Sequence, residues 1–209
     1  MSGFFVTGTG TGVGKTVLSA ALMLRLRGSG PVRYFKPIQT GIEQDDDTAE
    51  VRRLAGCSDA EILDGGIRLR GAVSPHLAAQ RAGVEIDLRS LQNAMAGFDG
   101  TWIVEGAGGV LVPVNGSRTM ADLIKLLGLP VIVAAASGLG TINHTLLTLE
   151  ALRARALQVA GVVMIGEANA ENREAIERYG KIAVLGEMPR FDPLTPERLA
   201  QWAAEGLRL

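Results

Sequence analysis

The sequence predicts an α/β fold built on a doubly wound, mostly parallel sheet with helices on both faces. Short apolar runs alternate with helical patterns along the whole chain, at a spacing typical of strand–helix–strand units. The run Leu129–Ala135 is apolar without alternation, which is typical of a strand buried on both faces of a parallel sheet. A glycine-rich turn joins the first apolar run to the first helical pattern.

Length and composition narrow the class of protein. The chain has 209 residues, 47% of them hydrophobic and 21% charged, with a net charge of −1. We expect one globular domain over residues 1–209. The near-neutral charge provides no basic field for nucleic acid or for a membrane surface, so we expect neither as a partner. The lone Cys57 and the absence of a signal-like start or a membrane-length apolar run predict a cytoplasmic protein.

The first strand, glycine turn and helix form a nucleotide-binding motif. Phe4–Val6 is the predicted strand, Gly8–Thr16 reads G-x-x-x-x-x-G-K-T, and Val17–Leu24 is the predicted helix. Glycines let successive backbone N–H groups face an anion at the positive end of the helix. Lys15 supplies a cation for phosphates and Thr16 a hydroxyl for Mg²⁺. The loop is one residue longer than the usual P-loop; the alternative is a plain glycine-rich turn.

The second predicted strand leads to two candidate charged groups. Val32–Phe35 is the strand, and Lys36–Gly41 is a loop at its carboxyl end, where ligands bind in parallel sheets. Lys36 is therefore expected on the same rim as the glycine loop, unless it is a solvated lysine at a strand end. The run Asp45–Asp47 precedes a helix over 49–55. One of its carboxylates is a candidate metal ligand, and the alternative is a capped, solvated loop.

The next elements lead to a second acidic candidate. We predict a short strand at Ile67–Leu69, a helix that Ser74 caps, and another helix that begins after Asp87. The apolar strand that follows, from Trp102, ends at Glu105 and runs into glycines. A carboxylate at this place in a P-loop protein lies near Mg²⁺. A strand end with a glycine turn is the alternative for Glu105.

The remaining chain continues the alternation. Asn143 and His144, after the glycine turn at 138–140, are either anion donors in a helix first turn or mere caps. The other expected elements are a helix from Thr119 or Met120 to Leu127, a helix over 145–155, a strand over 158–166, a helix over 171–179, a strand over 182–189 and a closing helix over 196–204.

Six motifs in this order resemble the dethiobiotin synthetase family. They read GTGTGVGKT, KPIQTG, DDDTAEV, VSPH, VEGAGGVLVPV and LGTINHTLLTLEAL, and they cover nearly the whole chain through Leu152. The family also has the longer P-loop. The resemblance implies a P-loop NTPase-type fold and a homodimer that performs the penultimate step of biotin biosynthesis. It implies an ATP- and Mg²⁺-dependent cyclo-ligase acting on 7,8-diaminopelargonate (7,8-diaminononanoate) and CO₂.

The implied reaction passes through a carbamate and a carbamic–phosphoric anhydride. By resemblance, Lys36 and Lys15 are catalytic, and Thr16, Asp47 and Glu105 hold the metal. The implied nucleotide-binding residues are Gly12, Val13, Gly14, Lys15, Thr16, Val17, Asp47, Glu105, Gly106, Ala107, Gly108, Gly166, Pro189, Arg190 and Phe191. The implied substrate-binding residues are Thr11, Thr40, Gly140, Thr141 and Asn143, with the tail carboxylate received at the subunit interface.

One region departs from the family and two other classes compete with it. The adenine-reading segment is here Gly166–Asn169, so base selectivity is either loose or carried by Asn169. A ParA/MinD-type ATPase switch would carry a signature lysine five residues before Lys15, where this chain has Gly10. A ligase of the cobyrinate-amidase kind normally carries a glutaminase domain, for which 209 residues leave no room.

Overall fold

The computed structural model describes residues 1–209 and confirms the doubly wound parallel sheet. All pairs of neighbouring strands in the main sheet are parallel. The strand order is β4 (Ile62–Leu63), β2 (Val32–Phe35), β6 (Thr101–Gly109), β1 (Ser2–Gly8), β7 (Val131–Ala136), β8 (Val159–Ile165) and β9 (Val184–Met188). The long strands β1 and β6 therefore lie at its centre.

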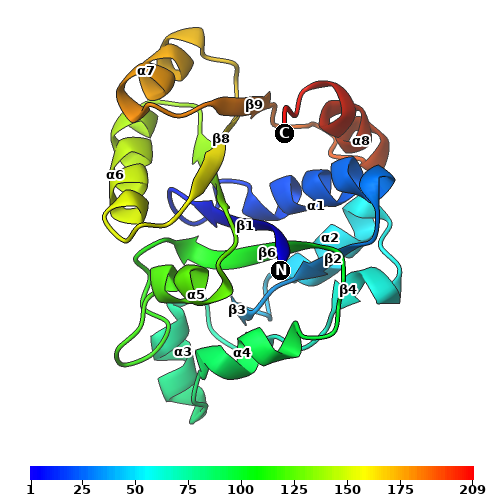
Figure 1. Ribbon diagram of the computed structural model, residues 1–209, viewed down its shortest axis with the longest axis vertical. Coiled ribbons are helices and arrows are strands. Elements are labelled where there is room, and N and C mark those ends of the chain that lie inside the picture. The colour runs from blue at the N-terminus through cyan, green and yellow to red at the C-terminus, as the bar shows by residue number, and fades with distance from the viewer.

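Helices cover both faces of this sheet (Figure 1). One face carries α1 (Lys15–Leu26), α2 (Asp47–Ala55) and α8 (Pro196–Glu205), which contact one another. The other carries α3 (Pro75–Ala82), α4 (Leu88–Ala94), α5 (Met120–Leu127), α6 (Thr141–Arg153) and α7 (Ala170–Gly180). No helix has both the length and the apolar composition required to cross a membrane.

Each face of the sheet has its own buried core. Successive strand residues point to opposite faces, so Phe5 and Val104 pack with the layer of α5 and α6, while Val6 and Ile103 pack with α1 and α2. Because both faces are covered, the central strands are apolar without alternation. Burial on both sides fixes the register of β1 and β6, and with it the positions of the groups at their carboxyl ends.

Several predicted boundaries are wrong. The predicted loop over 36–41 contains a strand, β3 (Ile38–Thr40), which pairs with β5 (Ile67–Leu69) in a separate two-stranded sheet. Strand β6 does not end at Glu105 but continues to Gly109, because β1 supplies pairing partners at both positions. Helix α6 begins at Thr141, because Gly140 adopts a left-handed conformation (φ 89°) that starts the first turn there.

Of the two helix caps predicted for α3 and α4, only the second forms a capping hydrogen bond through its side chain. Ser74 occupies the cap position of α3 but its side chain makes no capping bond, and its hydroxyl instead lies 3.0 Å from His76 Nδ1. Asp87 caps α4 as predicted, accepting from the backbone N–H groups of Arg89 and Ser90.

Candidate functional site

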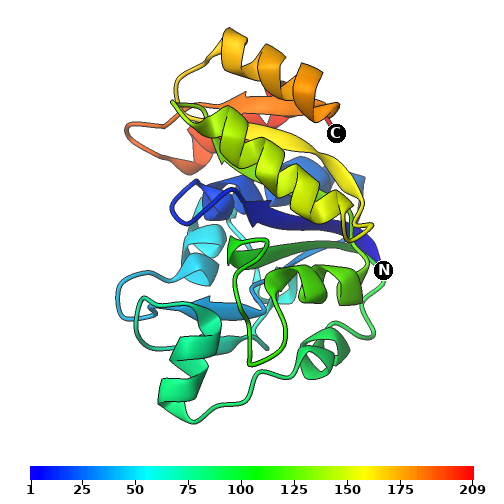
Figure 2. The ribbon, with the colours of Figure 1, turned by 90° about the vertical axis from the view of Figure 1, so that its left-hand side faces the viewer.

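The carboxyl ends of the strands meet at one edge of the molecule, opposite the N-terminus. Figure 2 shows the glycine loop after β1 and the loop that leads into α2 on this edge. Gly14 is the residue before α1 and has φ 95°, a conformation that favours glycine. A Cβ at Gly14 would also lie 2.9 Å from Ile165 Cδ1. The P-loop thus packs tightly against β8 as it enters the helix.

Lys15 is held against its own loop. The ammonium donates to the Gly10 carbonyl at 3.1 Å, and the side chain is largely buried. Burial and the nearby Lys36 ammonium together lower the pKa of Lys15 below its usual value. Lys15 forms no ion pair with an acidic side chain, and a cation beside a glycine-rich loop at a helix N-terminus is suited to a polyphosphate, which would supply the anionic partner.

Three oxygen-bearing side chains converge beyond the P-loop. The Thr16 hydroxyl lies 2.9 Å from Asp47 Oδ1 and 3.0 Å from Glu105 Oε1. Thr16 comes from α1, Asp47 from the first residue of α2 and Glu105 from the middle of β6. Two carboxylates and one hydroxyl are hard donors that fit Mg²⁺, which takes its other ligands from water and phosphate. The chain has no cluster of three or more His, Cys, Asp or Glu side chains for a metal held by protein alone.

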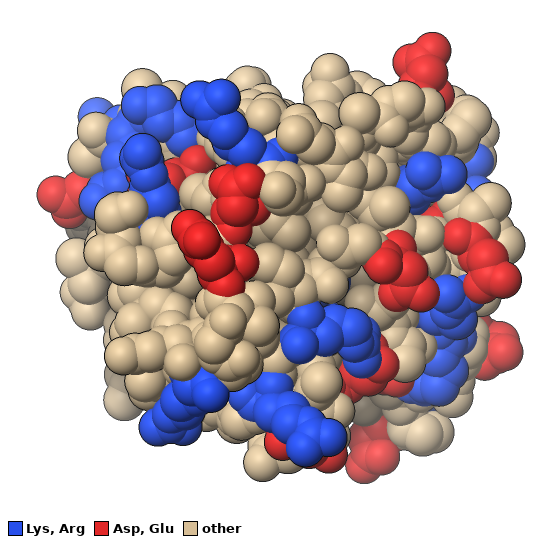
Figure 3. Space-filling model, turned by 90° about the horizontal axis from the view of Figure 1, so that it is seen from below, with Lys and Arg blue, Asp and Glu red and all other residues tan.

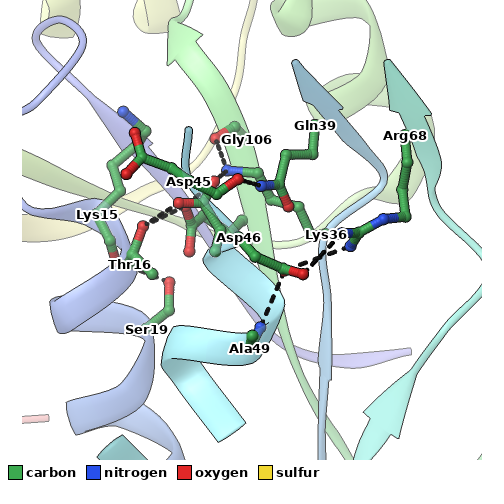
Figure 4. A network of polar contacts seen from close by, with 12 residues as sticks. Lys15, Thr16, Ser19, Lys36, Gln39, Asp45, Asp46, Ala49, Arg68 and Gly106 are labelled. Carbon is green, nitrogen blue, oxygen red and sulfur yellow. Dashed lines mark hydrogen bonds and ion pairs between the residues drawn. The ribbon is translucent and has the colours of Figure 1, made fainter. Parts of the chain in front are cut away.

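Lys36 lies between the carboxylates of Asp47 and Glu105 rather than in solvent, and Figure 4 shows it within the polar network that includes Thr16 and Gly106. Its Nζ is 2.6 Å from Asp47 Oδ2 and 2.7 Å from Glu105 Oε1, and it donates to the Gly106 carbonyl at 3.2 Å. The residue is only 6% exposed, so the alternative of a solvated lysine is wrong. Burial alone would lower the pKa of Lys36, but the two carboxylates outweigh it and raise the pKa.

Lys36 compensates the charge of the acidic side chains that surround it. Burial would raise the pKa of Asp47, but the charge and hydrogen bond of Lys36, with the Thr16 hydroxyl, lower it. Glu105 is fully buried and shares Lys36 with Asp47. Buried charges persist only when they are paired, so the ammonium of Lys36 allows the two carboxylate groups to lie close together.

The structure distinguishes the three aspartates that precede α2. Asp47 alone contacts Thr16 and Lys36. Asp46 caps α2 by accepting from the Ala49 N–H at 3.0 Å, and it pairs with Arg68 at 2.7 Å. Asp45 offers its backbone carbonyl to Gln39 Nε2 at 2.7 Å (Figure 4). The two carboxylates that precede Asp47 therefore have no contact with the Thr16–Glu105 group.

Most of the predicted site residues line two adjoining cavities. The larger, of about 600 Å³, is lined by Thr11, Gly12, Gly14, Lys15, Thr16, Val17, Lys36, Thr40, Asp47, Glu105, Ala107 and Gly108. The smaller, of about 330 Å³, is mostly apolar and is lined by Gly12, Val13, Gly14, Val17, Pro189, Arg190 and Phe191. The two share the P-loop, so one bound molecule could extend from one cavity into the other.

Five predicted residues line neither cavity. Gly106 takes part only through its carbonyl, which accepts from Lys36. Gly166, Gly140, Thr141 and Asn143 are absent from both linings. Asn169 serves as a helix cap, since its side chain accepts from the Asn172 N–H at 2.9 Å. The start of α6 instead borders a surface groove lined in part by Thr11, His144 and Leu147.

Sequence reasoning missed four polar residues of the site. Gln39, Gln44 and Ser74 line the larger cavity, and the Tyr34 hydroxyl donates to Glu105 Oε2. Gln39 belongs to the strand β3 that the prediction treated as a loop. Tyr34 lies in β2 two residues before Lys36, which follows the end of that strand, and this spacing in an extended segment places both on the same side and could have indicated Tyr34.

The charged surface agrees with the composition. On the face in Figure 3, basic and acidic side chains are interspersed and form no continuous area of one sign. A face of this kind does not favour a polyanion such as nucleic acid.

Residues 2–198 match a protein-family model described as an AAA domain. A protein of Agrobacterium fabrum named ATP-dependent dethiobiotin synthetase BioD is 46% identical over 206 residues, covering 99% of this chain and 94% of that protein. One of Rhodopseudomonas palustris with the same name is 46% identical over 194 residues, covering 93% of this chain and 88% of its own.

Solved structures resemble the chain in fold alone. A ParA family ATPase from Chlorobium tepidum superimposes with a TM-score of 0.60 at 10% identity, over 97% of both chains. The MinC:MinD cell division protein complex of Aquifex aeolicus gives a TM-score of 0.60 at 12% identity, over 97% of this chain and 86% of that one.

Proposed function

The chain belongs to the family of ATP-dependent dethiobiotin synthetases, and from that premise we propose the reaction and the residues that carry it. Membership makes the protein an ATP-dependent cyclo-ligase of biotin biosynthesis. The proposed substrates are 7,8-diaminopelargonate, CO₂ and MgATP, and the proposed products are dethiobiotin, ADP and phosphate. The observation that carries the proposal is the convergence of Lys15, Lys36, Asp47 and Glu105 at the P-loop.

The proposed reaction has three bond-forming steps. One amine nitrogen attacks CO₂ and loses a proton, which gives a carbamate. A carbamate oxygen attacks the γ-phosphorus of ATP and ADP leaves, which gives a carbamic–phosphoric anhydride. The second amine then attacks the carbamoyl carbon and loses a proton, phosphate leaves, and the five-membered ureido ring closes.

The charged residues match the needs of the second step. Carbamate and γ-phosphate repel each other, and the transition state gathers their charge, so fixed cations nearby lower the barrier. Lys15 is proposed to contact the γ-phosphate and Lys36 the carbamate and the γ-phosphate. Mg²⁺, held by Thr16, Asp47 and Glu105, would neutralise phosphate charge. The anhydride is hydrolysable, so a site closed between two subunits would favour ring closure over attack by water.

The remaining contacts are assigned by position in the cavities. Thr40 and Thr11 line the larger cavity, where the diamine or carbamate would lie. The smaller, apolar cavity at Pro189, Arg190 and Phe191 adjoins the P-loop and suits a nucleotide base. Gly140, Thr141 and Asn143 lie outside both cavities of their own chain. We therefore propose that they bind the tail carboxylate of a substrate whose diamine end lies in the larger cavity of the other subunit.

The test of the function is phosphate release from MgATP with and without diaminopelargonate and bicarbonate. We expect release to require both, and dethiobiotin to appear in proportion by mass spectrometry. Stimulation by DNA or lipid vesicles with no need for the diamine would contradict the proposal and favour an ATPase switch. A requirement for glutamine or ammonia would favour an amide-forming ligase.

Glu105→Gln is expected to raise the Mg²⁺ concentration needed for half-maximal phosphate release, because Gln keeps the shape but loses the charge that binds a hard cation. Asp47→Asn should do the same, and a Mg²⁺ titration of each variant measures the shift. Asp46→Asn is the matched control, since Asp46 caps α2 and pairs with Arg68 outside the cation site. If Asp46→Asn shifts the titration and Asp47→Asn does not, the proposed ligand set is wrong.

The proposal that the protein forms a homodimer rests on the family resemblance and on exposed apolar side chains near α6. Leu147 is 56% exposed, and with the exposed Leu111 it lines the groove that also contains Thr11. Leu139, just before α6, is exposed as well. Apolar side chains gathered in this way mark a surface that a partner covers. A second copy here would bring α6 close to the larger cavity through Thr11, which lines both.

Leu147→Glu is expected to weaken dimerisation at least about tenfold, because a buried, unpaired charge at an interface costs more than 1.4 kcal/mol. Sedimentation equilibrium measures the change, and the KM for the diamine should rise while nucleotide affinity is kept. Val84→Glu is the control, since Val84 is also exposed but lies outside the groove. Equal effects of the two substitutions, or none, would count against this interface.

A further inference from the structure

Tyr34 is a buried polar residue that the reaction scheme does not use. Its side chain is fully buried in the core between the sheet and helices α1 and α2. Its hydroxyl donates to Glu105 Oε2 at 3.0 Å. A tyrosine in a core position that served only packing would be replaceable by phenylalanine, so the hydroxyl requires an explanation of its own.

The two oxygens of Glu105 have different partners. Oε1 faces the site, where it contacts Lys36 at 2.7 Å and Thr16 at 3.0 Å. Oε2 faces the core and contacts Tyr34. Tyr34 lies in β2 and Lys36 is the residue that follows the end of that strand, and residues two apart in an extended chain point to the same side, so both reach the same carboxylate. The carboxylate is therefore held from opposite sides, with one oxygen directed outward.

Tyr34 is held in place as the donor to Oε2. Its hydroxyl has no other hydrogen-bond partner in the chain, and its ring is fixed among buried apolar side chains that include Leu18 and Val51. Nothing else in the chain donates to Oε2, so this bond would remain when Lys36 and Thr16 exchange their contacts with Oε1 for a cation.

We propose that Tyr34 is a positioning residue that restricts Glu105 to offering a single oxygen to the divalent cation, and that it thereby favours Mg²⁺ over Ca²⁺. The inference rests on the proposed function only in taking Glu105 as a metal ligand. It adds a determinant of which metal the site accepts.

The chemistry of the two ions connects this hydrogen bond to selectivity. Mg²⁺ is small and requires near-octahedral geometry, which single oxygens satisfy. Ca²⁺ takes six to eight oxygens and often binds both oxygens of one carboxylate. A Glu105 whose Oε2 is engaged by Tyr34 can serve the first geometry but not a two-oxygen contact. Removal of the hydroxyl frees Oε2 to turn toward the larger ion.

The test compares Tyr34→Phe with the wild type in metal competition. Mn²⁺ is bound to each protein with a non-hydrolysable ATP analogue, and free Mn²⁺ is followed by electron paramagnetic resonance while Mg²⁺ or Ca²⁺ is added. The same titration with nucleotide alone is subtracted. Tyr179→Phe is the matched control, because it removes the same hydroxyl from a residue that is 65% exposed.

We expect Tyr34→Phe to weaken Mg²⁺ about tenfold, as loss of a partner behind a metal ligand typically does, and Ca²⁺ much less. The ratio of Ca²⁺ to Mg²⁺ dissociation constants should therefore fall about tenfold, while Tyr179→Phe leaves it unchanged. A ratio that stays constant, with both affinities unchanged or lowered in parallel, overturns the inference. Thermal melting of each variant separates a general loss of stability from this metal-specific effect.

Two further measurements separate an error in the metal-ligand assignment from an error in the role of Tyr34. Glu105→Gln in the same competition tests the assignment. An unchanged Mn²⁺ affinity would contradict the proposed ligand set, whereas a weakened affinity leaves only the role of Tyr34 in question. A crystal structure of the wild type with Mn²⁺ and the analogue needs no substitution at all. One Glu105 oxygen on the metal and the other on Tyr34 supports the inference, and two oxygens on the metal overturn it.

Discussion

Lys36→Met should slow diamine-dependent phosphate release by at least about 100-fold, while binding of a non-hydrolysable ATP analogue survives. The ammonium is proposed to lie between carbamate and γ-phosphate, whose charges come together in the transition state, so its contribution is larger there than in the ground state. Methionine retains much of the packing of the lysine stem. Lys15, Thr16 and the amides of the P-loop remain to hold the nucleotide.

Loss of the Lys36 charge also leaves Asp47 and Glu105 facing each other without a cation. Breaking a buried pair by removing one partner typically costs about 3–5 kcal/mol, so the variant should be less stable in the absence of Mg²⁺ and should recover with it. Phosphate release and analogue binding are therefore measured at saturating Mg²⁺, after thermal melting has shown the variant to be folded. Lys125→Met, which changes an exposed lysine of α5, is the control.

The two measurements on Lys36→Met separate the possibilities. If nucleotide affinity and phosphate release fall by the same factor, Lys36 is a nucleotide ligand with no special role in ring closure. If neither falls, the ammonium serves only to pair the carboxylates of Asp47 and Glu105.

Lys15→Ala should reduce turnover by roughly 10²–10³, about 3–4 kcal/mol, the usual cost of removing one electrostatic contact to the reacting group. The structure gives Lys15 a single protein partner, the Gly10 carbonyl, so its removal exposes no buried charge and should leave the fold intact. Steady-state phosphate release measures the change, with Lys125→Ala as the control. Turnover within threefold of the wild type would show that this loop is not where ATP reacts.

The sequence was sufficient for the parts of the site that follow from strand order. Lys36 follows β2 and Glu105 lies in the neighbouring parallel strand β6, and parallel strands run toward the same edge of the sheet, so their approach could be predicted from the alternation of strands and helices. The choice among Asp45, Asp46 and Asp47 by residue pattern could not be predicted. It depends on where α2 begins, because Asp46 becomes the cap and Asp47 the first helical residue.

The features that sequence reasoning missed depend on contacts between distant segments. Strand β3 forms only because β5 lies beside it, and three residues carry too short a pattern to be recognised alone. Tyr34 in an apolar strand is indistinguishable from a packing residue until the position of Glu105 above it is known. The extension of β6 beyond Glu105 likewise requires the register with β1.

That extension has a mechanical consequence for the cation site. Glu105 is carried by a strand paired with β1 on one side and β2 on the other, so its backbone cannot shift without breaking two ladders at once. Asp47 stands at the start of a helix, after a loop over 41–46 that joins it to β3. One carboxylate of the site is therefore fixed by the central sheet, and the other is attached to it through a loop. When a metal ion of different size and charge replaces the ammonium, the segment that carries Asp47 is the part that can adjust the distance between the two carboxylates.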